Sequence, residues 1–168
     1  KGGTGKTSIS ASFAQMAGTK DENRFAVFVD ADVDAANISL VLQPEQSSKH
    51  EFWGGSLAEN DAQICTGCGA CVPVCRYDAI LPDISNPPAL RIDPIACDGC
   101  AACVYACPED AVKMEPQQEG YWYQSVTPFG QLFHADLFPG KDNSGKLVTL
   151  VRQHARLWAE ESDNQMVI

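Results

Sequence analysis

The stretch "CTGCGACVPVCRYDAI", residues 65–80, returns 32 residues later as "CDGCAACVYACPEDAV", residues 97–112. Nine of the sixteen aligned positions are identical, and the chain's 8 cysteines all lie in these two copies. Each copy has the spacing C-x-x-C-x-x-C-x-x-x-C, in which the first three thiolates can wrap one iron-sulfur cubane. The fourth thiolate cannot easily reach the same cubane, and in two-cluster proteins it binds the other one. The spacing therefore predicts two 4Fe-4S clusters with crossed ligands.

The crossed arrangement assigns four cysteines to each cluster. One set is Cys65, Cys68, Cys71 and Cys107, and the other is Cys97, Cys100, Cys103 and Cys75. Small residues lie between these ligands, where backbone amides can donate to cluster sulfurs without an intervening side chain. They are Gly67, Gly69, Ala70, Gly99, Ala101 and Ala102.

Two other uses of the cysteines remain open. Structural zinc sites use pairs of C-x-x-C units, in which a third cysteine at the same spacing has no role. Disulfides need an oxidising compartment, and no secretion signal opens the chain. Clusters that serve only as structural staples are a further alternative, although two adjacent clusters exceed that need and favour electron transfer.

Residues 59–117 resemble the bacterial-type dicluster ferredoxin modules. The resemblance implies a small α+β domain that carries electrons between partner proteins. One departure is Arg76, where that family's motif usually has proline. Its positive charge is expected to raise the potential of the cluster that Cys75 binds.

The chain opens "KGGTGKT", residues 1–7, the end of a G-x-x-x-x-G-K-[ST] phosphate loop whose first glycine would precede Lys1. In such a loop the backbone amides face phosphate oxygens, Lys6 reaches the β and γ phosphates, and the Thr7 hydroxyl binds Mg²⁺. The expected nucleotide-binding residues are Gly2, Gly3, Thr4, Gly5, Lys6, Thr7 and Ser8. A plain glycine-rich turn is the alternative.

The residues after this loop predict an α/β pattern. Ile9, Phe13 and Met16 have helical spacing before Gly18, and the apolar run 24–30 predicts a buried parallel strand ending in Asp30. A loop and a short helix are expected before Pro44. This order gives helix, strand and helix of a parallel α/β sheet.

The rest of the chain predicts a connector, a hairpin, a helix and a strand. Residues 43–61 are polar and read as a connector, and residues 120–140 read as a hairpin around Pro128 and Gly130. Residues 143–163 predict an amphipathic helix capped by Asn143 or Ser144. Its expected stripe is Leu147, Leu150, Val151, His154, Leu157 and Trp158. The closing "NQMVI" predicts a buried strand, and His50 and His134 are expected at the surface.

Lys1, directly after the missing glycine, resembles the deviant phosphate loops of the MinD, ParA, Mrp and nitrogenase iron-protein group. By that resemblance Lys1, Lys6 and Asp32 are catalytic: Lys1 reaches the partner's nucleotide across a dimer, and Asp32 positions the attacking water. Asp30 would support Mg²⁺ through water. A solvated loop that caps a strand end is the alternative for Asp30, Asp32 and Asp34.

The combination resembles MinD-superfamily ATPases with an inserted dicluster ferredoxin domain. Residues 143–153 match that family's return helix. The fold class this implies is an incomplete parallel-sheet P-loop ATPase, residues 1–44 and 118–168, interrupted by the insert at 59–117. The implied cofactors are ATP, Mg²⁺ and two 4Fe-4S clusters, and the implied partner is a second copy or a related ATPase.

Three functions are compatible with this resemblance. The first is an ATPase that gates electron transfer, the second an ATP-dependent cluster carrier, and the third a redox-sensing regulator like MinD or ParA. A net charge of -10 disfavours nucleic-acid and membrane partners, and a cytoplasmic location is expected. Residues 1–168 alone are expected not to hydrolyse ATP, and the redox partner is not legible.

Overall fold

The computed structural model describes residues 5–18, 26–141, 143–162 and 167–168. The chain forms two compact units, the first comprising Lys1–Gly54 and Gln118–Ile168 and the second Gly55–Gln117. The boundaries expected from the sequence were at 44, 59 and 117, so the first unit extends further along the chain than expected. Strands β2 (Gln46–Asn60) and β5 (Val112–Thr127) contain the two boundaries.

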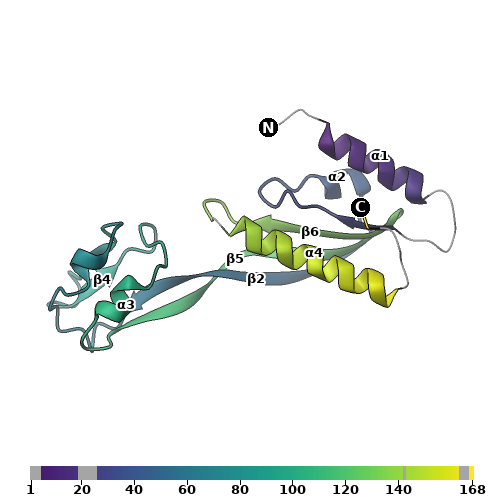
Figure 1. The fold of residues 1–168 in the computed structure, drawn as a ribbon. Coiled ribbons are helices and arrows are strands. Elements are labelled where there is room, and N and C mark those ends of the chain that lie inside the picture. Colours follow the sequence, from purple (N-terminus) through teal and green to yellow (C-terminus); the bar gives the residue numbers. More distant parts are fainter. Residues whose placement is uncertain (1–4, 19–25, 142, 163–166) are drawn as a thin grey trace. The chain divides into compact units, whose positions relative to one another are not determined.

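The first unit contains a four-stranded sheet with the order β1-β6-β5-β2 (Figure 1). Strand β1 (Ala26–Val29) pairs in parallel with β6 (Gly130–Leu137), and β6 pairs antiparallel with β5 across the expected hairpin. The sheet is therefore mixed, which corrects the expectation of a parallel sheet. A hairpin partner must run antiparallel, because a two-residue turn cannot reverse the chain in any other way.

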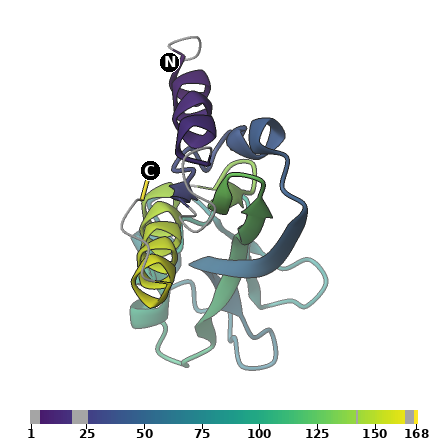
Figure 2. The same ribbon diagram turned by 90° about the vertical axis from the view of Figure 1, so that its right-hand side faces the viewer.

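Alternation along the strands sends side chains to two faces of this sheet. On one face Phe133 and Ala135 pack against α4 (Ser144–Glu161), through the buried Leu147 and Val151. On the other face Phe28 and Leu132 pack in a second cluster, to which α1 (Lys6–Gly18) and α2 (Ile38–Leu42) contribute Ala14 and Leu42 among others. Figure 2 shows α4 and α1 at different sides of the strands.

The helix α4 confirms the predicted amphipathic segment, but two members of its expected stripe, His154 and Leu157, are exposed. Leu157 is 55% exposed, whereas Ala155 and Ala159 are buried. The buried line follows the i, i+4 spacing from Leu147, which Leu157 leaves by about half a turn. His154 is exposed but stacks on Trp122 with ring centroids 4.3 Å apart, so it packs as expected.

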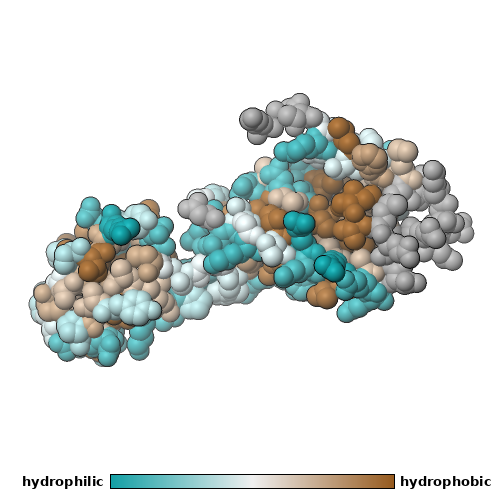
Figure 3. Space-filling view, in the orientation of Figure 1, coloured by the Kyte–Doolittle hydropathy of each residue, from teal (hydrophilic) through white to brown (hydrophobic). Residues whose placement is uncertain are grey.

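The helix α1 confirms the prediction of a helix after Gly5. Its expected apolar residues Ile9, Phe13 and Met16 are exposed, and the helix buries Ala14 instead. A hydrophobic area is visible on the first unit between α1 and α4 (Figure 3). Within the described part of the chain, no helix combines the length and apolar character that crossing a membrane requires.

Residues 43–61 are not a connector. Residues 46–60 form β2, whose side chains are mostly exposed or half-buried. Among the described strands, β2 lies at the edge of the sheet, next to β5. An edge strand is often polar, so β2 lacks the regular apolar alternation by which a strand is recognised in a sequence. Composition alone therefore made it look like a loop.

Val167 forms a parallel bridge with Val27, which agrees with a strand beginning in "NQMVI". Both Val167 and Ile168 are exposed rather than buried. The expected strand residues Arg24, Phe25, Asn164, Gln165 and Met166 lie outside the described residues.

The second unit is short in regular structure. It contains a 3-10 turn η1 (Val72–Val74), helix α3 (Ala102–Ala106), and an antiparallel pair formed by β3 (Ile80–Pro82) and β4 (Leu90–Ile92). Its core includes two buried cysteines, Cys71 and Cys103, together with Ala58, Ile80 and Val112. Thiols thus form part of this core, and the cysteines also surround two cavities.

Candidate metal centre

Two cavities in the second unit are lined by the cysteines. The first has about 290 Å³ of empty space, part of which is open solvent, and its cysteines are Cys65, Cys68, Cys71 and Cys107. The second has about 330 Å³, and its cysteines are Cys75, Cys97, Cys100 and Cys103. Each cavity thus combines three cysteines of one copy with the fourth of the other, the same division that the crossed assignment makes.

The two copies share the same left-handed backbone positions. Positive φ angles recur at positions separated by the repeat: 71° at Gly67 and 74° at Gly99, 76° at Gly69 and 62° at Ala101. Asp78 and Asp110 also correspond, at 51° and 52°. These left-handed residues turn the chain around each cavity, and glycine meets this need at least steric cost.

Hydrogen bonds tie the copies together with the same symmetry. The Asp61 N–H donates to the Ala111 carbonyl and the Asp93 N–H to the Ala79 carbonyl, both at 2.8 Å. Each aspartate carbonyl then accepts from the first cysteine of its copy, Cys65 or Cys97, at 2.9 and 3.0 Å. The start of each copy is therefore held against the end of the other, which brings the fourth cysteine across.

Backbone amides point at the sulfurs of the fourth cysteines. The Ala79 N–H donates to Cys75 Sγ at 3.4 Å, and the Ala111 N–H donates to Cys107 Sγ at 3.3 Å. Both alanines are at most 2% exposed, so solvent does not compete for these amides. Such bonds stabilise negative charge on sulfur.

The electrostatic surroundings differ among the thiols. Burial raises the pKa of Cys71 and Cys103, because a thiolate loses hydration there. Burial acts in the same sense on Cys65, but the N–H groups of Leu90 and Gly67 and the side-chain amide of Asn60 outweigh it and lower its pKa.

The donor set fits a cubane better than a single ion. Zinc–sulfur bonds of about 2.3 Å require four sulfurs within about 4 Å of one another. Among the residues that the structure describes, no three His, Cys, Asp or Glu side chains form a group that could hold one metal ion. Four thiols spread around an apolar cavity match a 4Fe-4S cluster, which supplies one-electron chemistry when bound.

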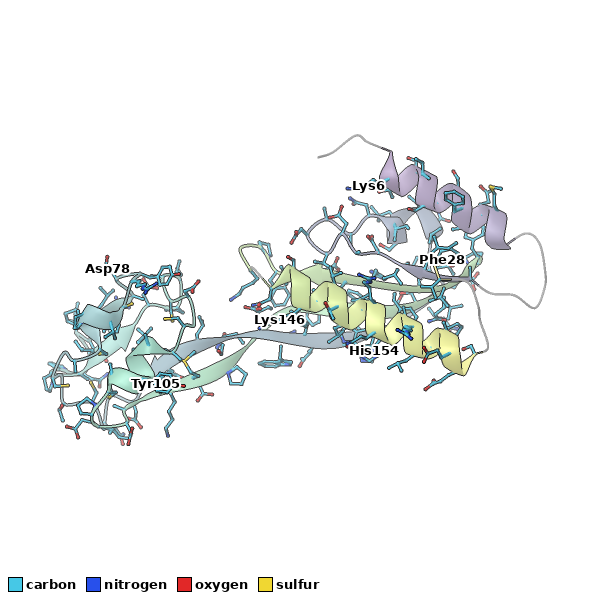
Figure 4. The ribbon with its side chains drawn as sticks, viewed as in Figure 1. Lys6, Phe28, Asp78, Tyr105, Lys146 and His154 are labelled. Carbon is cyan, nitrogen blue, oxygen red and sulfur yellow. The ribbon has the colours of Figure 1, made fainter. Side chains whose placement is uncertain are left out.

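The predicted nucleotide residues lie in the first unit. Four of them lie outside the described residues: Lys1, Gly2, Gly3 and Thr4. Gly5 has a φ of 78°, and α1 begins at Lys6. Lys6 and Ser8 are exposed and Thr7 is half-buried. Figure 4 shows Lys6 at the start of α1 and Phe28 on β1 below the helix.

Hydrogen bonds fix the conformation of the acidic loop that follows β1. Asp30 accepts hydrogen bonds from the Asp32 N–H at 3.0 Å and the Ile38 N–H at 3.3 Å, so it closes the loop onto the start of α2. Val33 is buried, and its carbonyl accepts from the Leu137 N–H at 3.0 Å. Asp32 and Asp34 are exposed. These contacts agree with the alternative in which Asp30 caps the loop. Each carboxylate oxygen of Asp30 can still accept a further hydrogen bond.

Sequence reasoning missed two features of the site. Asn60 and Leu90 line the first cavity, and the repeated aspartates Asp61 and Asp93 position the first cysteines. The aspartates carried a signal, since they repeat at the same shift of 32 as the cysteines. Asn60 carried none, because Ile92 stands at the matching position.

The prediction for His134 was wrong. It is buried, its Nε2 lies 3.1 Å from Ser125 Oγ, and its ring stacks on Tyr123 at 4.7 Å. Among the described residues its Nδ1 has no hydrogen-bond partner. Strand alternation in β6 placed it on the covered face with Leu132.

Comparison with known proteins supports an iron-sulfur domain with two clusters. Residues 64–111 match the model of the 4Fe-4S dicluster domain. The chain is also 38% identical over 162 residues to "Uncharacterized protein MJ0578" of Methanocaldococcus jannaschii, a match that covers 96% of this chain and 54% of that relative. The chain therefore spans about half the length of the relative it matches.

Proposed function

We propose, from the premise that residues 64–111 form a 4Fe-4S dicluster domain, that this chain belongs to an ATP-binding protein in which nucleotide controls electron transfer through the two clusters. The observation that carries electron transfer is the pair of four-cysteine cavities in one small unit. Cys68 and Cys100 are exposed, so an edge of each cavity is open to a partner protein.

The nucleotide part rests on the start of the first unit. Gly5, Lys6 and Thr7 have the identities of a phosphate-loop end, and a 13-residue helix begins there. The positive end of such a helix favours phosphate. Asp30 follows the buried parallel strand β1, the position from which an acidic side chain supports Mg²⁺ in α/β nucleotide sites. Asp32, Lys1 and Thr7 have the proposed roles that the resemblance gives them.

The proposed coupling is a shift between two arrangements. Nucleotide moves such an equilibrium only by its different affinity for the two states. A dimer that closes around MgATP would change the access of a redox partner to the clusters, and so the rate of electron delivery. The second copy, or a related ATPase, is the proposed partner.

Anaerobic potentiometry of the cluster-loaded protein, with MgATP and with MgADP, tests this proposal. We expect a difference between the two nucleotides in cluster potential or in the rate of reduction by a small protein donor. Lys6→Ala should abolish the difference and leave the iron content unchanged, because Lys6 lies in the other unit.

Two outcomes would overturn the proposal. One is that equilibrium dialysis detects no binding of MgATP. The other is cluster absorbance that passes to an apo acceptor at a rate raised by ATP, which would identify a carrier instead.

A further inference from the structure

The two cysteine cavities can be compared position by position, because the repeat relates their lining residues. Cys65 of the first cavity corresponds to Cys97 of the second, and Val112 corresponds to Ile80. Among the lining residues that are buried or half-buried, one pair differs in polarity: Asn60 lines the first cavity where Ile92 lines the second.

Asn60 is placed to act on Cys65. Its Nδ2 donates to the Leu90 carbonyl, and its side-chain amide also interacts with the Cys65 sulfur. Leu90 lines the same cavity, and its backbone N–H also contributes to the lowered pKa of Cys65, so the bond from Asn60 fixes a second polar group beside this sulfur. Ile92 has no polar side-chain atom and, partly buried, packs against the core of the unit.

A donor to a ligand sulfur favours the reduced, more negative cluster and raises its reduction potential. The other polar differences lie in exposed residues. The first cavity has Thr66 and Glu109 where the second has Asp98 and Tyr77, and all four are exposed. Arg76 beside Cys75 is exposed as well. Charges in solvent are screened by water and salt, whereas Asn60 is half-buried against the sulfur.

We infer that the two clusters have unequal potentials, and that Asn60 makes the cluster held by Cys65, Cys68, Cys71 and Cys107 the one that is reduced first. An electron that reaches the cluster held by Cys75, Cys97, Cys100 and Cys103 then passes to the first cluster, which gains the electron that the second loses. Asn60 is a tuning residue and not a ligand. The inference rests on the dicluster part of the proposed function and is independent of ATP.

Exchanging the two side chains tests this inference with matched variants. Asn60→Ile gives the first cavity the side chain of the second, and Ile92→Asn does the reverse. Dithionite, a one-electron donor after dissociation, is titrated anaerobically against the cluster-loaded protein, and the reduced clusters are counted by electron paramagnetic resonance. The wild type should reduce in two separate steps.

In Asn60→Ile the higher step should move down, so that the ratio of reduced to oxidised cluster at a fixed potential falls about tenfold, which is 59 mV for one electron. The lower step should stay. In Ile92→Asn the lower step should move up toward the higher one. Iron content and visible absorbance confirm that both clusters are still bound.

Three results would overturn the inference: coincident steps in the wild type, an Asn60→Ile variant in which the lower step moves instead, and an Ile92→Asn variant with unchanged potentials. If Asn60→Ile fails to bind iron, the Ile92→Asn variant still decides. Equal potentials together with normal electron delivery would refute this inference and leave the proposed function standing.

Discussion

At the scale of residues, the site depends on a few backbone positions that only small side chains satisfy. Gly67 and Gly99 have positive φ, and a Cβ at either would collide with a backbone carbonyl oxygen, that of Pro88 or Ser56. Gly69 also has positive φ, but nothing lies within 4 Å of its Cβ position. Its counterpart is Ala101, which adopts the same conformation at φ 62°.

We therefore expect Gly67→Ala to displace the Pro88 segment and to lose the cluster of the first cavity, with Gly69→Ala as its matched control. Gly69→Ala should keep both clusters and lose only about 1–2 kcal/mol of stability, the ordinary cost of a left-handed alanine. Iron analysis and visible absorbance measure the first effect, and denaturant unfolding measures the second. Full iron content in Gly67→Ala would contradict the collision.

His134 makes stability dependent on pH. Burial lowers its pKa, while the nearby carboxylates of Asp136 and Asp30 act in the opposite direction more weakly. The unfolded state, with a pKa of about 6.5, then binds the proton more readily than the folded state. The stabilisation by neutral His134 is thus complete above about pH 6.5 and is lost as the pH falls below it.

Urea unfolding between pH 7.5 and pH 5.5 should show this loss, and His134→Leu should reduce the slope. His50→Gln, at an exposed histidine, is the control and should keep the slope of the wild type. The interpretation is wrong if both variants follow the same curve as the unaltered chain.

At the scale of elements, α4 stabilises the first unit through one buried line of side chains. Leu147, Val151 and Ala155 are 0% exposed and pack on the sheet face that carries Phe133. The Asn143 amide before the helix donates to the buried Glu119 at 2.5 Å. The start of α4 is therefore attached to β5 as well as packed on the sheet.

Leu147→Ala should cost about 2–5 kcal/mol of unfolding free energy, because it leaves a cavity in this line. Leu157→Ala removes the same atoms from a side chain that is 55% exposed and should cost under about 0.5 kcal/mol. Denaturant midpoints of the two variants, measured side by side, distinguish them. Equal losses would mean that Leu157 is buried in solution, as the sequence pattern had indicated.

At the scale of the whole molecule, each unit has its own core. The core of the second unit contains Cys71, Cys103 and Ile80 and, in the part of the chain that the structure describes, draws no residue from outside 55–117. All eight cysteines and both cavities belong to that unit. The expected nucleotide residues belong to the first.

Residues 55–117, made as a separate chain and reconstituted anaerobically with iron and sulfide, should therefore bind both clusters with the spectrum of the intact chain. A small domain gains much of its stability from such groups, so the apo segment should be largely unfolded. Circular dichroism before and after reconstitution measures the change. Failure to bind iron where the intact chain succeeds would show that the strands of the first unit are required.

The cysteine spacing by itself predicted two 4Fe-4S clusters, and it predicted the crossed division of the cysteines that the two cavities display. Local periodicity also determined the helices 6–18 and 144–161, the strand after the first, and the hairpin. These features depend on residues close together in the chain, whose spacing the sequence displays directly.

Only the tertiary structure decided which side chains are buried and which residues of the two copies come into contact. It turned the polar residues 46–60 into a strand, buried His134 while exposing Leu157, and brought Asn60 to Cys65. Each outcome depends on which distant segment covers a given face, since burial and hydrogen-bond partners are set by packing between elements and not by the order of residues within one.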